Sequence, residues 1–413
     1  MKTYKYAIIG GGLAGQQAGD GIRKVDTEGD VILVTAESHA PYQRPPLSKG
    51  YLRGEEGLDK VYLKEETYYA RNGIEVVSGV RANAVDPAAR RVMLDDGRTL
   101  GYEKLLLATG SRAWRLPISG NDLPGVFALR TIEDADAIRE AAQESERALV
   151  VGGSFIGSEV AASLAQLGLG VTMVFLESRL LEAIVPDELS TWLHNKYEAN
   201  GVRILPNATL ECLRGCEGVK RAVIRNDESH ILEVDLVVMG VGVRLNTEMA
   251  QGAGLEMAED GGVVVDAHLR TSAPSIYAAG DIAAWPDPTF GKRLRVEHWD
   301  VARRQGLRAG RNMAGDPKPY TALPYFFSDL FDLSFEVWGD LTTWDQTVLR
   351  GSLDEGSFAF YYFHQGSMVG VLTAGRPDEE RKPMQALVSA RSTYTEIADS
   401  LRDEAVDLGA LVD

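Results

Sequence analysis

A glycine-rich motif that occurs twice constrains the fold more than any other feature of the sequence. The first copy lies in KYAIIGGGLAGQQAGDGI, where Gly10, Gly12 and Gly15 follow an apolar run and precede a helical pattern. This G-x-G-x-x-G spacing is typical of the strand–turn–helix unit that binds a dinucleotide. The first glycine permits the turn, the second lets backbone approach a pyrophosphate, and the third lets the helix pack on the strand. The helix N-terminus then favours the anion, because its N–H groups are free.

An acidic residue at a suitable distance strengthens each copy of the motif. Glu37 ends the apolar segment VILVTAE, about 20 residues after Gly15, and can accept hydrogen bonds from both ribose hydroxyls. The second copy is RALVVGGSFIGSEVAASLAQLGLGVTMVFLE, in which the corresponding residues are Gly152, Ser154, Gly157 and Glu177. A glycine turn alone is weak evidence, but its combination with the spaced acid favours nucleotide binding.

The segments after each copy repeat as well. A hairpin is expected near Asp96 and Gly97 after the first copy, and near Asn226 and Asp227 after the second. Each hairpin leads into an apolar strand that ends in glycine, KLLLATG and DLVVMGVG. A repeat of this length indicates a duplicated domain rather than a solenoid, whose repeats are about 20–50 residues.

The remaining segments point to a further ligand-binding edge and a third domain. TSAPSIYAAGD predicts a short buried strand that stops at Gly280 and Asp281, and strand ends of this kind bind ligands in open α/β sheets. Taken alone, such an acid is more often a helix cap. Residues 320–413 then predict antiparallel strands in FEVWGD, TVLRGS, FAFYYFHQ and SMVGVLTA, followed by closing helices in MQALVSARSTYTEIADSLRD. A chain of 413 residues is too long for one core, so two or three domains are expected.

Composition excludes several function classes. The net charge of −17, from 60 acidic and 43 basic residues, argues against nucleic acid as a partner. No apolar run approaches the about 18 residues that a membrane helix needs, and the first one breaks into glycines, so we expect no membrane contact and a cytoplasmic location. Cys212 and Cys216 are the only cysteines, and the six histidines show no ligand spacing. We therefore expect no disulfide and no metal site, and we interpret both cysteines as ordinary packing, with a reactive pair as the less favoured alternative.

Together these motifs resemble the FAD-dependent pyridine nucleotide oxidoreductases of the glutathione-reductase fold. The segments PYQRPPLSKGYL, GSFIGSE, AAGDIA, RVEHWDVARRQG and FFSDLFDL resemble one branch of that group. The branch holds oxygenase-coupled NADH:ferredoxin reductases of the rubredoxin and putidaredoxin type, and apoptosis-inducing factor. The resemblance implies an α/β fold with two Rossmann-like dinucleotide-binding domains, one inserted in the other, and a C-terminal α+β interface domain. The FAD-binding domain would comprise residues 1–112 and 246–319, the NAD(H)-binding domain 113–245, and the interface domain 320–413.

The resemblance gives meaning to the segment after the first glycine turn. Disulfide reductases of this fold carry redox cysteines beside the flavin, whereas this sequence has Arg44, Pro45, Leu47, Ser48 and Lys49. A thiol relay is thus excluded, and electrons must pass from the flavin directly to a protein carrier, a quinone or oxygen. The resemblance also implies that Lys49 lies near flavin N5 and pairs with Glu159, where a cation stabilises negative charge on the reduced ring. Without the resemblance, Lys49 would read as a surface lysine at a helix start.

The expected chemistry is that of the cofactors. Nicotinamide C4 stacks on flavin N5 and passes a hydride, while the protein contributes orientation and electrostatics, so no general acid or base is required. The helix that begins in VEHWD would aim its positive N-terminus at the flavin, with Glu297, His298 and Trp299 against the ring. Phe327 stands where relatives carry a tryptophan over the flavin face.

The resemblance thereby assigns a catalytic and a cofactor-binding set. The expected catalytic residues are Lys49, Glu159, His298, Trp299 and Phe327. The expected residues for FAD and NADH binding are Gly10, Gly12, Leu13, Ala14, Gly15, Glu37, Arg44, Pro45, Lys49, Ala108, Thr109, Gly110, Arg130, Gly152, Gly153, Ser154, Phe155, Ile156, Gly157, Glu177, Gly242, Gly280, Asp281, Glu297, His298 and Trp299.

Two residues of the second copy affect how the coenzyme binds and which coenzyme is preferred. Ser154 replaces the second glycine of the motif, so a side chain is expected to intrude where the pyrophosphate approaches, with Gly153 beside it as compensation. Glu177 can hold the ribose hydroxyls of NADH and would repel a 2′-phosphate, so NADH is favoured over NADPH despite the nearby Arg179.

Three functions fit these expectations. The first is an NADH-dependent reductase that passes electrons singly to a ferredoxin or rubredoxin, and the second is a peroxide-forming NADH oxidase. The third is a redox sensor like apoptosis-inducing factor, which forms a stable charge-transfer complex of reduced flavin and NAD. The helix VARRQGLRAGRN has a small apolar face with Ala302, Gly306, Ala309 and Met313. A basic stripe with Arg304, Arg308 and Arg311 lines the opposite face, and Arg303 could join it. The stripe could dock an acidic carrier, although a solvated face is the commoner role. The sequence leaves a homodimer open.

Overall fold

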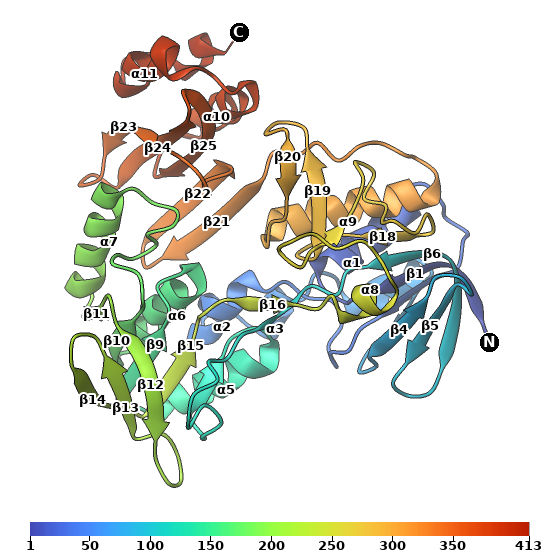
Figure 1. Cartoon of the computed structure of the whole chain (residues 1–413), viewed down its shortest axis with the longest axis horizontal. Coiled ribbons are helices and arrows are strands. Elements are labelled where there is room, and N and C mark those ends of the chain that lie inside the picture. Colours follow the sequence, from blue (N-terminus) through green and yellow to red (C-terminus); the bar gives the residue numbers. More distant parts are fainter. Residues whose placement is uncertain (413) are drawn as a thin grey trace. The chain divides into compact units, whose positions relative to one another are not determined.

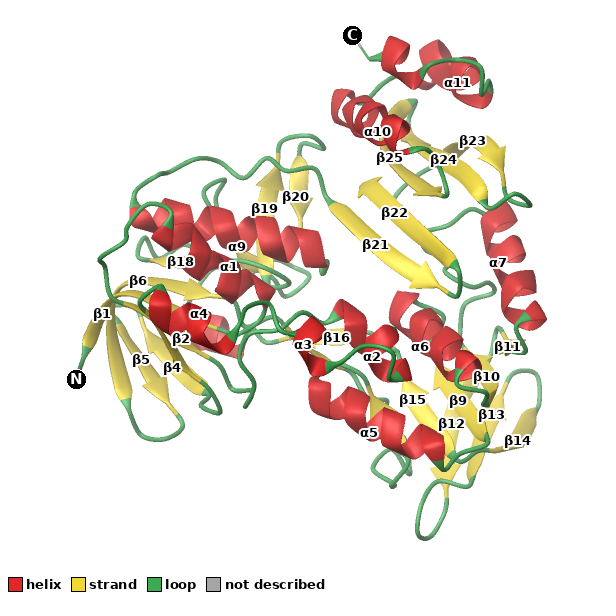
Figure 2. Cartoon of the chain, turned by 180° about the vertical axis from the view of Figure 1, so that it is seen from behind, coloured by secondary structure: helices red, strands yellow, loops and turns green. Residues whose placement is uncertain are grey.

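The computed structural model describes residues 1–412, except for the side chain of Glu66. The chain forms two compact units (Figures 1 and 2). The first unit comprises residues 1–43, 59–112 and 244–326, and the second comprises residues 44–58, 113–243 and 327 to the C-terminus. The predicted division into three domains stays a prediction.

A seven-stranded sheet forms the centre of the first unit. Its order is β3-β2-β1-β6-β5-β4, and β18 pairs with β6. The strands are β1 (Thr3–Ile9), β2 (Val31–Val34), β3 (Ile74–Val77), β4 (Ala82–Asp86), β5 (Arg91–Leu94), β6 (Thr99–Leu107) and β18 (Ile276–Ala278). Strands β1, β2, β3, β6 and β18 run parallel. All residues of β2 and β18 are buried, as expected for parallel strands covered on both faces.

Two helices lie side by side on this unit because glycines let their backbones meet. They are α1 (Leu13–Arg23) and α9 (Trp299–Ala314) (Figures 1 and 2). A Cβ at Gly306 would lie 2.2 Å from the Ala14 carbonyl oxygen, and a Cβ at Gly310 would lie 2.1 Å from that of Ala18. The apolar face predicted for the second helix is confirmed, because Gly306 and Ala309 are buried against this contact.

The second unit contains a parallel sheet of the same strand order. It runs β11-β10-β9-β15-β8 and corresponds to the order β3-β2-β1-β6-β18 of the first unit. Its strands are β8 (Val126–Ala128), β9 (Arg147–Val151), β10 (Gly170–Val174), β11 (Arg203–Leu205) and β15 (Leu236–Met239). The helices of this part are α5 (Ile132–Gln143), α6 (Phe155–Gln166) and α7 (Asp187–Ala199). The predicted duplication is therefore confirmed.

The two predicted hairpins are present but join their sheets differently. In the first unit, β4 and β5 extend the main sheet through the long strand β6. In the second unit, β12 (Thr209–Arg214), β13 (Arg221–Arg225) and β14 (Ser229–Glu233) form a separate three-stranded sheet. Free Cys212 is half-buried on β12, but Cys216 is exposed. The prediction that both cysteines pack in the interior is wrong for Cys216, because this residue lies in the turn after β12.

An antiparallel sheet makes up the C-terminal part of the second unit. Its order is β21-β22-β25-β24-β23. The strands are β21 (Tyr325–Leu330), β22 (Leu333–Gly339), β23 (Gln346–Ser352), β24 (Ser357–His364) and β25 (Ser367–Ala374). Helices α10 (Asp378–Ala390) and α11 (Tyr394–Arg402) and the 3-10 turn η2 (Leu408–Leu411) follow, and both helices pack on this sheet (Figure 2). The four strands and closing helices are confirmed, whereas β21 was not predicted.

Shorter elements complete the chain. They are η1 (Pro45–Ser48), α2 (Gly50–Arg53), α3 (Leu58–Val61), α4 (Glu66–Arg71), β7 (Ser111–Ala113), β16 (Val243–Leu245), α8 (Glu248–Gly252), β17 (Val263–Val264), β19 (Ala283–Asp287) and β20 (Lys292–Leu294). Within residues 1–412, no helix has the length and apolar character needed to cross a membrane. Over the same residues, the acidic, histidine and cysteine side chains form no group that could hold a metal ion.

Candidate active site

The first glycine turn encloses a space that suits a pyrophosphate. A Cβ at Gly10 would lie 2.0 Å from the Ala108 carbonyl oxygen, and one at Gly15 would lie 1.9 Å from that of Gly10. A Cβ at Gly12 would meet no atom within 4 Å. Gly12 is the N-cap of α1 and supplies no capping side chain, so the first N–H groups of this helix remain available to an anion. The turn is tight where the backbone packs and open where a phosphate would enter.

We call the glycine turn of residues 10–15 together with Glu37 the first cradle, and the turn of residues 152–157 together with Glu177 the second. Glu37, which is predicted to bind the ribose, is held in one orientation. Glu37 follows β2, is half-buried, and accepts a hydrogen bond from the hydroxyl of Tyr42. Its carbonyl oxygen accepts a second hydrogen bond from the N–H of Gly79 at 2.9 Å. Sequence reasoning missed Tyr42, although the residue lies only five positions after the acid.

The carboxyl ends of β6 and β18 carry the other predicted residues of the first cradle. These strands pair in parallel, so their ends meet at the same edge of the sheet. Asp281 is 9% exposed and accepts a hydrogen bond of 2.7 Å from the Ser111 hydroxyl. Thr109 donates its hydroxyl to the Asn246 carbonyl at 2.6 Å. The structure therefore holds Asp281 as a buried carboxylate at the edge where a ligand is predicted to bind, and Ser111 is a partner that the sequence did not reveal.

The start of α9 brings an aromatic stack into the first unit. His298 is the N-cap residue of this helix. Its ring lies 4.1 Å from that of Phe326, with the planes inclined by 13°. Burial removes water from the imidazole and lowers the pKa of His298 to about 4, although the charge of Asp281 acts to raise this pKa. The imidazole is neutral at pH 7 and can contribute ring surface and a hydrogen bond rather than a charge.

The two residues that flank His298 already have polar or aromatic partners. Glu297 forms an ion pair of 2.5 Å with Arg295. Trp299 begins α9, and the Arg303 guanidinium lies 5.6 Å from the centre of its ring. The structure places all three residues of this segment at the N-terminus of α9, as predicted, and their contact with a flavin stays a prediction.

The second glycine turn repeats the first with one difference. A Cβ at Gly152 would lie 2.3 Å from the Gly240 carbonyl oxygen, and one at Gly157 would lie 2.2 Å from that of Gly152. Ser154 is the N-cap of α6, but its hydroxyl makes no capping hydrogen bond. It donates instead to the Gly240 carbonyl at 3.1 Å. The serine hydroxyl therefore leaves the N–H groups of α6 available, and this turn also suits a pyrophosphate.

The surroundings of the second turn are open to solvent. Ile156 on α6 is 46% exposed, and Leu176, which follows β10, is 73% exposed. The neighbouring acid Glu177 is exposed. Phe175 packs its ring behind Gly153, so that a Cβ there would lie 2.9 Å from the ring. Two exposed apolar side chains beside an exposed acid are suited to an adenosine group, which offers a flat ring and ribose hydroxyls.

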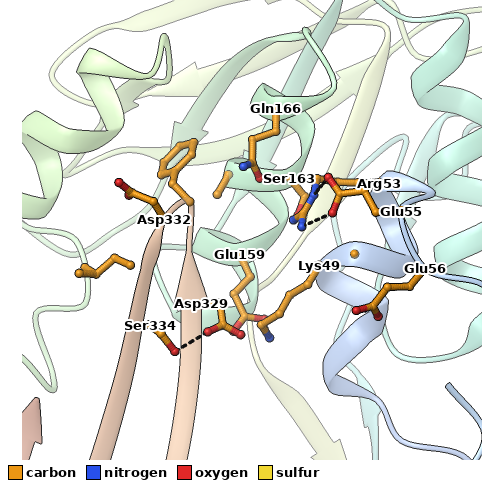
Figure 3. A pocket seen from close by; sticks show the side chains of 14 residues that line it. Lys49, Arg53, Glu55, Glu56, Glu159, Ser163, Gln166, Asp329, Asp332 and Ser334 are labelled. Atoms are coloured by element: carbon orange, nitrogen blue, oxygen red, sulfur yellow. Dashed lines mark hydrogen bonds and ion pairs between the residues drawn. The ribbon is translucent and has the colours of Figure 1, made fainter. Parts of the chain in front are cut away.

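A buried ion pair joins the segment that carries no cysteine to helix α6 (Figure 3). Lys49 Nζ lies 2.8 Å from Glu159 Oε2, and the two side chains are 15% and 5% exposed. The Ser48 hydroxyl donates to the same oxygen at 2.5 Å, and the Ser328 hydroxyl donates to Glu159 Oε1 at 2.6 Å. The predicted pair is present, and the two serines are partners that sequence reasoning missed. Three donors therefore satisfy the two oxygens of the buried Glu159 carboxylate.

A polar cavity of about 300 Å³ opens beside this pair. In Figure 3, the Lys49 and Glu159 side chains point toward one another on its wall, with Asp329 close by. Lys49 Nζ also lies 5.9 Å from the centre of the Phe327 ring. The structure thus brings three of the five predicted catalytic residues together in the second unit, whereas His298 and Trp299 belong to the first.

Arg44 and Arg130, which were both predicted to bind a cofactor, lie in contact. The Arg44 guanidinium donates to the Arg130 carbonyl at 2.5 Å. The N–H of Arg130 donates in turn to Asp134, at 2.9 Å. Asp134 also forms a capping box with Thr131 at the start of α5, which fixes this turn.

The basic stripe on α9 is largely paired. Buried Asp300 forms ion pairs with Arg303 at 2.8 Å and with Arg304 at 2.5 Å. Arg311 pairs with Asp316 at 2.7 Å. Docking of an acidic carrier on this stripe is weakened by these neighbours, because each carboxylate offsets positive charge.

Comparisons with known proteins agree with this geometry. Residues 4–306 match the family described as pyridine nucleotide-disulphide oxidoreductase, and residues 325–412 match the family described as reductase C-terminal. The ferredoxin–NAD(+) reductase component of the anthranilate 1,2-dioxygenase system of Burkholderia cepacia is 35% identical over 87% of this chain and 88% of its own length. Putidaredoxin reductase of Pseudomonas putida is 31% identical over 98% of this chain and 96% of its own.

A solved structure agrees over the full length. The ferredoxin reductase for the CYP199A2 system of Rhodopseudomonas palustris matches with a TM-score of 0.92 and 31% identity, over 99% of this chain and all of that one. Two nucleotide cradles of one strand order, a C-terminal antiparallel sheet and these matches lead to one conclusion. The chain belongs to the pyridine nucleotide-disulphide oxidoreductase family.

Proposed function

We propose that this protein is an FAD-dependent oxidoreductase that takes a hydride from NADH and passes the electrons singly to a small iron–sulfur protein of the ferredoxin class. One observation carries the proposal. Two dinucleotide cradles occur in a chain whose segment after the first cradle, residues 40–52, contains no cysteine. The relatives described above bear names of ferredoxin and putidaredoxin reductases and align over most of both chains. A protein carrier is therefore favoured over a disulfide as the electron acceptor.

The residues of the first cradle fit the dinucleotide part of FAD. The open front of Gly12 and the N-terminus of α1 would bind the pyrophosphate, and Glu37 would bind the ribose. Bound FAD would supply the step from two-electron to one-electron transfer. The protein's own task is to hold charge near the reacting ring and to keep water out.

The Lys49–Glu159 pair would perform the electrostatic part of this task. The Glu159 carboxylate is 5% exposed and accepts three donors, so it holds the Lys49 ammonium in a defined position. A fixed cation of this kind stabilises negative charge that develops nearby, because it needs no reorganisation during the reaction. The centre of the Phe327 ring lies 5.9 Å from Lys49 Nζ, and this residue would offer a ring face for stacking.

The second cradle would bind NADH. Its pyrophosphate would meet the N-terminus of α6, and Glu177 would accept hydrogen bonds from the ribose hydroxyls. The exposure of Glu177 and Leu176 suits a coenzyme that must leave after each hydride transfer. A rubredoxin would be an alternative acceptor of similar size, and a homodimer is compatible with the proposal.

Single-turnover spectroscopy tests the function. Anaerobic mixing of the purified protein with NADH should bleach the flavin band within seconds, and addition of ferredoxin with cytochrome c should restore the band and reduce the cytochrome. Re-oxidation by air as fast as by ferredoxin would favour an oxidase. A persistent long-wavelength band that ferredoxin does not discharge would favour a redox sensor. A colourless protein that does not take up FAD would contradict the proposal.

A further inference from the structure

Arg179, which is close to the predicted coenzyme-binding residue Glu177, forms ion pairs with two carboxylates. Arg179 lies two residues after Glu177, in the loop that joins β10 to α7. Its guanidinium forms an ion pair of 2.6 Å with Asp187, the first residue of α7, and one of 3.5 Å with Glu182. Arg179 is 34% exposed, so its guanidinium is also within reach of solvent.

Glu182 stabilises the conformation of this loop. This carboxylate accepts hydrogen bonds from the Ser178 N–H at 2.7 Å and from the Ser178 hydroxyl at 3.0 Å. The hydroxyl and then the N–H of Ser178 lower the pKa of Glu182, which is therefore ionised at pH 7. Glu182 orders the backbone between Glu177 and α7, and Asp187 provides the shorter contact to Arg179.

Arg179 keeps unused hydrogen-bonding capacity. A guanidinium has five N–H donors, and Asp187 and Glu182 engage two of its nitrogens. The third nitrogen, Nε, is buried and has no hydrogen-bond partner among residues 1–412. In dinucleotide folds, an acid at the end of the second strand selects NAD, whereas an arginine near that place accommodates the 2′-phosphate of NADP. This loop contains both residue types within three positions.

We propose that Asp187, with help from Glu182, withholds Arg179 from the bound coenzyme, so that the loop contains a latent 2′-phosphate site which the wild-type protein keeps closed. The inference rests on the proposed binding of NADH in the second cradle and deepens it. Preference for NADH then has two sources, repulsion of a phosphate by Glu177 and retention of Arg179 by Asp187. Removal of Glu177 alone does not open the site, because the arginine remains engaged.

Titration calorimetry of the FAD-loaded protein tests the inference with two nucleotide fragments. 5′-ADP reports the adenosine and pyrophosphate sites, and 2′,5′-ADP carries a 2′-phosphate in place of the β-phosphate. With Glu177→Gln as the background, adding Asp187→Asn should tighten binding of 2′,5′-ADP by about tenfold or more, since a released guanidinium makes charge-assisted hydrogen bonds to the phosphate. Affinity for 5′-ADP should change by less than about twofold, because no phosphate contacts the arginine.

The neighbouring residue offers a matched control. Glu188 is exposed on the first turn of α7, and Glu188→Gln removes the same single charge one position away. In the Glu177→Gln background this change should tighten binding of 2′,5′-ADP by about twofold at most, through weaker long-range repulsion. Addition of Arg179→Met to the Glu177→Gln and Asp187→Asn protein should abolish the gain.

The outcomes separate the inference from the proposed function. Equal effects of Asp187→Asn and Glu188→Gln, or a gain that survives Arg179→Met, would overturn the latent site while leaving the NADH cradle in place. Failure of the wild-type holoprotein to bind 5′-ADP would overturn the nucleotide cradle and the inference with it. As a kinetic counterpart, the ratio of kcat/KM for NADPH to that for NADH should rise by about tenfold between the single and the double variant.

Discussion

The two nucleotide cradles share a strand order but differ in how they enclose a ligand. In the first, Gly12 leaves an open front and Glu37 is half-buried under the Tyr42 hydroxyl. In the second, Ser154 replaces that glycine, and Glu177 is exposed. The same fold therefore leaves the N–H groups at the start of each helix without a capping side chain, while the residues around the two turns differ in exposure.

A second difference lies two residues after the third glycine. The first helix carries Gln17, whose amide donates to the neighbouring Gln16. The second carries Glu159, which is buried and paired with Lys49. Duplication provided equivalent positions, and only one of them acquired a charge. We infer that the first cradle retains its cofactor and that the second exchanges its coenzyme beside a charged centre.

The largest expected effect concerns this charged centre. Lys49→Met should lower the free energy of unfolding by about 3–5 kcal/mol, because it leaves the buried Glu159 carboxylate without its cation. The double variant Lys49→Met with Glu159→Gln carries at position 159 the same amide that the first helix has at Gln17. This variant should recover more than half of the lost stability. Urea denaturation measures both. An unchanged urea midpoint for Lys49→Met would show that the ion pair does not contribute to the free energy of unfolding. The difference between Gln17 and Glu159 would then have no effect on stability.

The next effect separates the two glycine turns. Gly15→Ala and Gly157→Ala each force a Cβ to within about 2 Å of a backbone oxygen, and each should cost about 1–3 kcal/mol. Gly15→Ala should yield protein with little flavin. Gly157→Ala should keep its flavin and show a raised KM for NADH. The ratio of visible to ultraviolet absorbance measures flavin content.

Gly12→Ala serves as a control for these turns. A Cβ at Gly12 meets no protein atom within 4 Å, so this variant should fold normally and yet retain less flavin. Full flavin retention in Gly12→Ala would show that no phosphate approaches the turn there.

A smaller effect follows from the neutral imidazole of the first unit. The folded pKa of His298 is about 4, below its ordinary value of 6.5, so the unfolded chain binds more protons between these two values. Stability should therefore fall as pH decreases from 6.5 toward 4, by on the order of 1 kcal/mol between pH 7 and pH 5. His298→Asn should flatten this part of the profile, measured as urea midpoints. His230→Asn, at an exposed site on β14, should leave it unchanged.

The smallest effect concerns Ser154, the residue that occupies a glycine position of the second motif. Ser154→Gly gives the second turn the open front of the first and removes a hydrogen bond to Gly240. The KM for NADH should change by about threefold or less, as expected for the loss of one neutral hydrogen bond, and FAD content should not change. Steady-state kinetics at saturating acceptor provide the measurement. A larger change would show that the serine side chain does obstruct the pyrophosphate.

Much of the fold could be predicted because its signals are local. The buried strands, the glycine turns, the hairpins and the C-terminal helices all follow from apolar runs and turn residues close together in the chain. Strand β21 was missed, because three consecutive aromatic residues, Tyr325 to Phe327, hide the alternation of a half-buried strand. The exposure of Cys216 was also missed, since a cysteine has no intrinsic preference for a turn.

The candidate site was predicted less completely. The Lys49–Glu159 pair was expected from a family resemblance, not from the spacing of the two residues. Ser328 lies 169 positions from Glu159, and Ser111 lies 170 positions from Asp281. No periodicity or motif connects residues so far apart. These hydroxyl donors are visible only once the chain is folded.

The sequence by itself determined two glycine turns, their acidic partners, the parallel strands and the absence of a thiol beside the first cradle, because each depends on backbone sterics or side-chain chemistry within a short segment. Tertiary structure alone decided which carboxylate is buried, which arginine is held by which acid, and which cradle is open. Burial and pairing are set by residues that meet across the fold, and these contacts determine the charge and accessibility on which the chemistry depends.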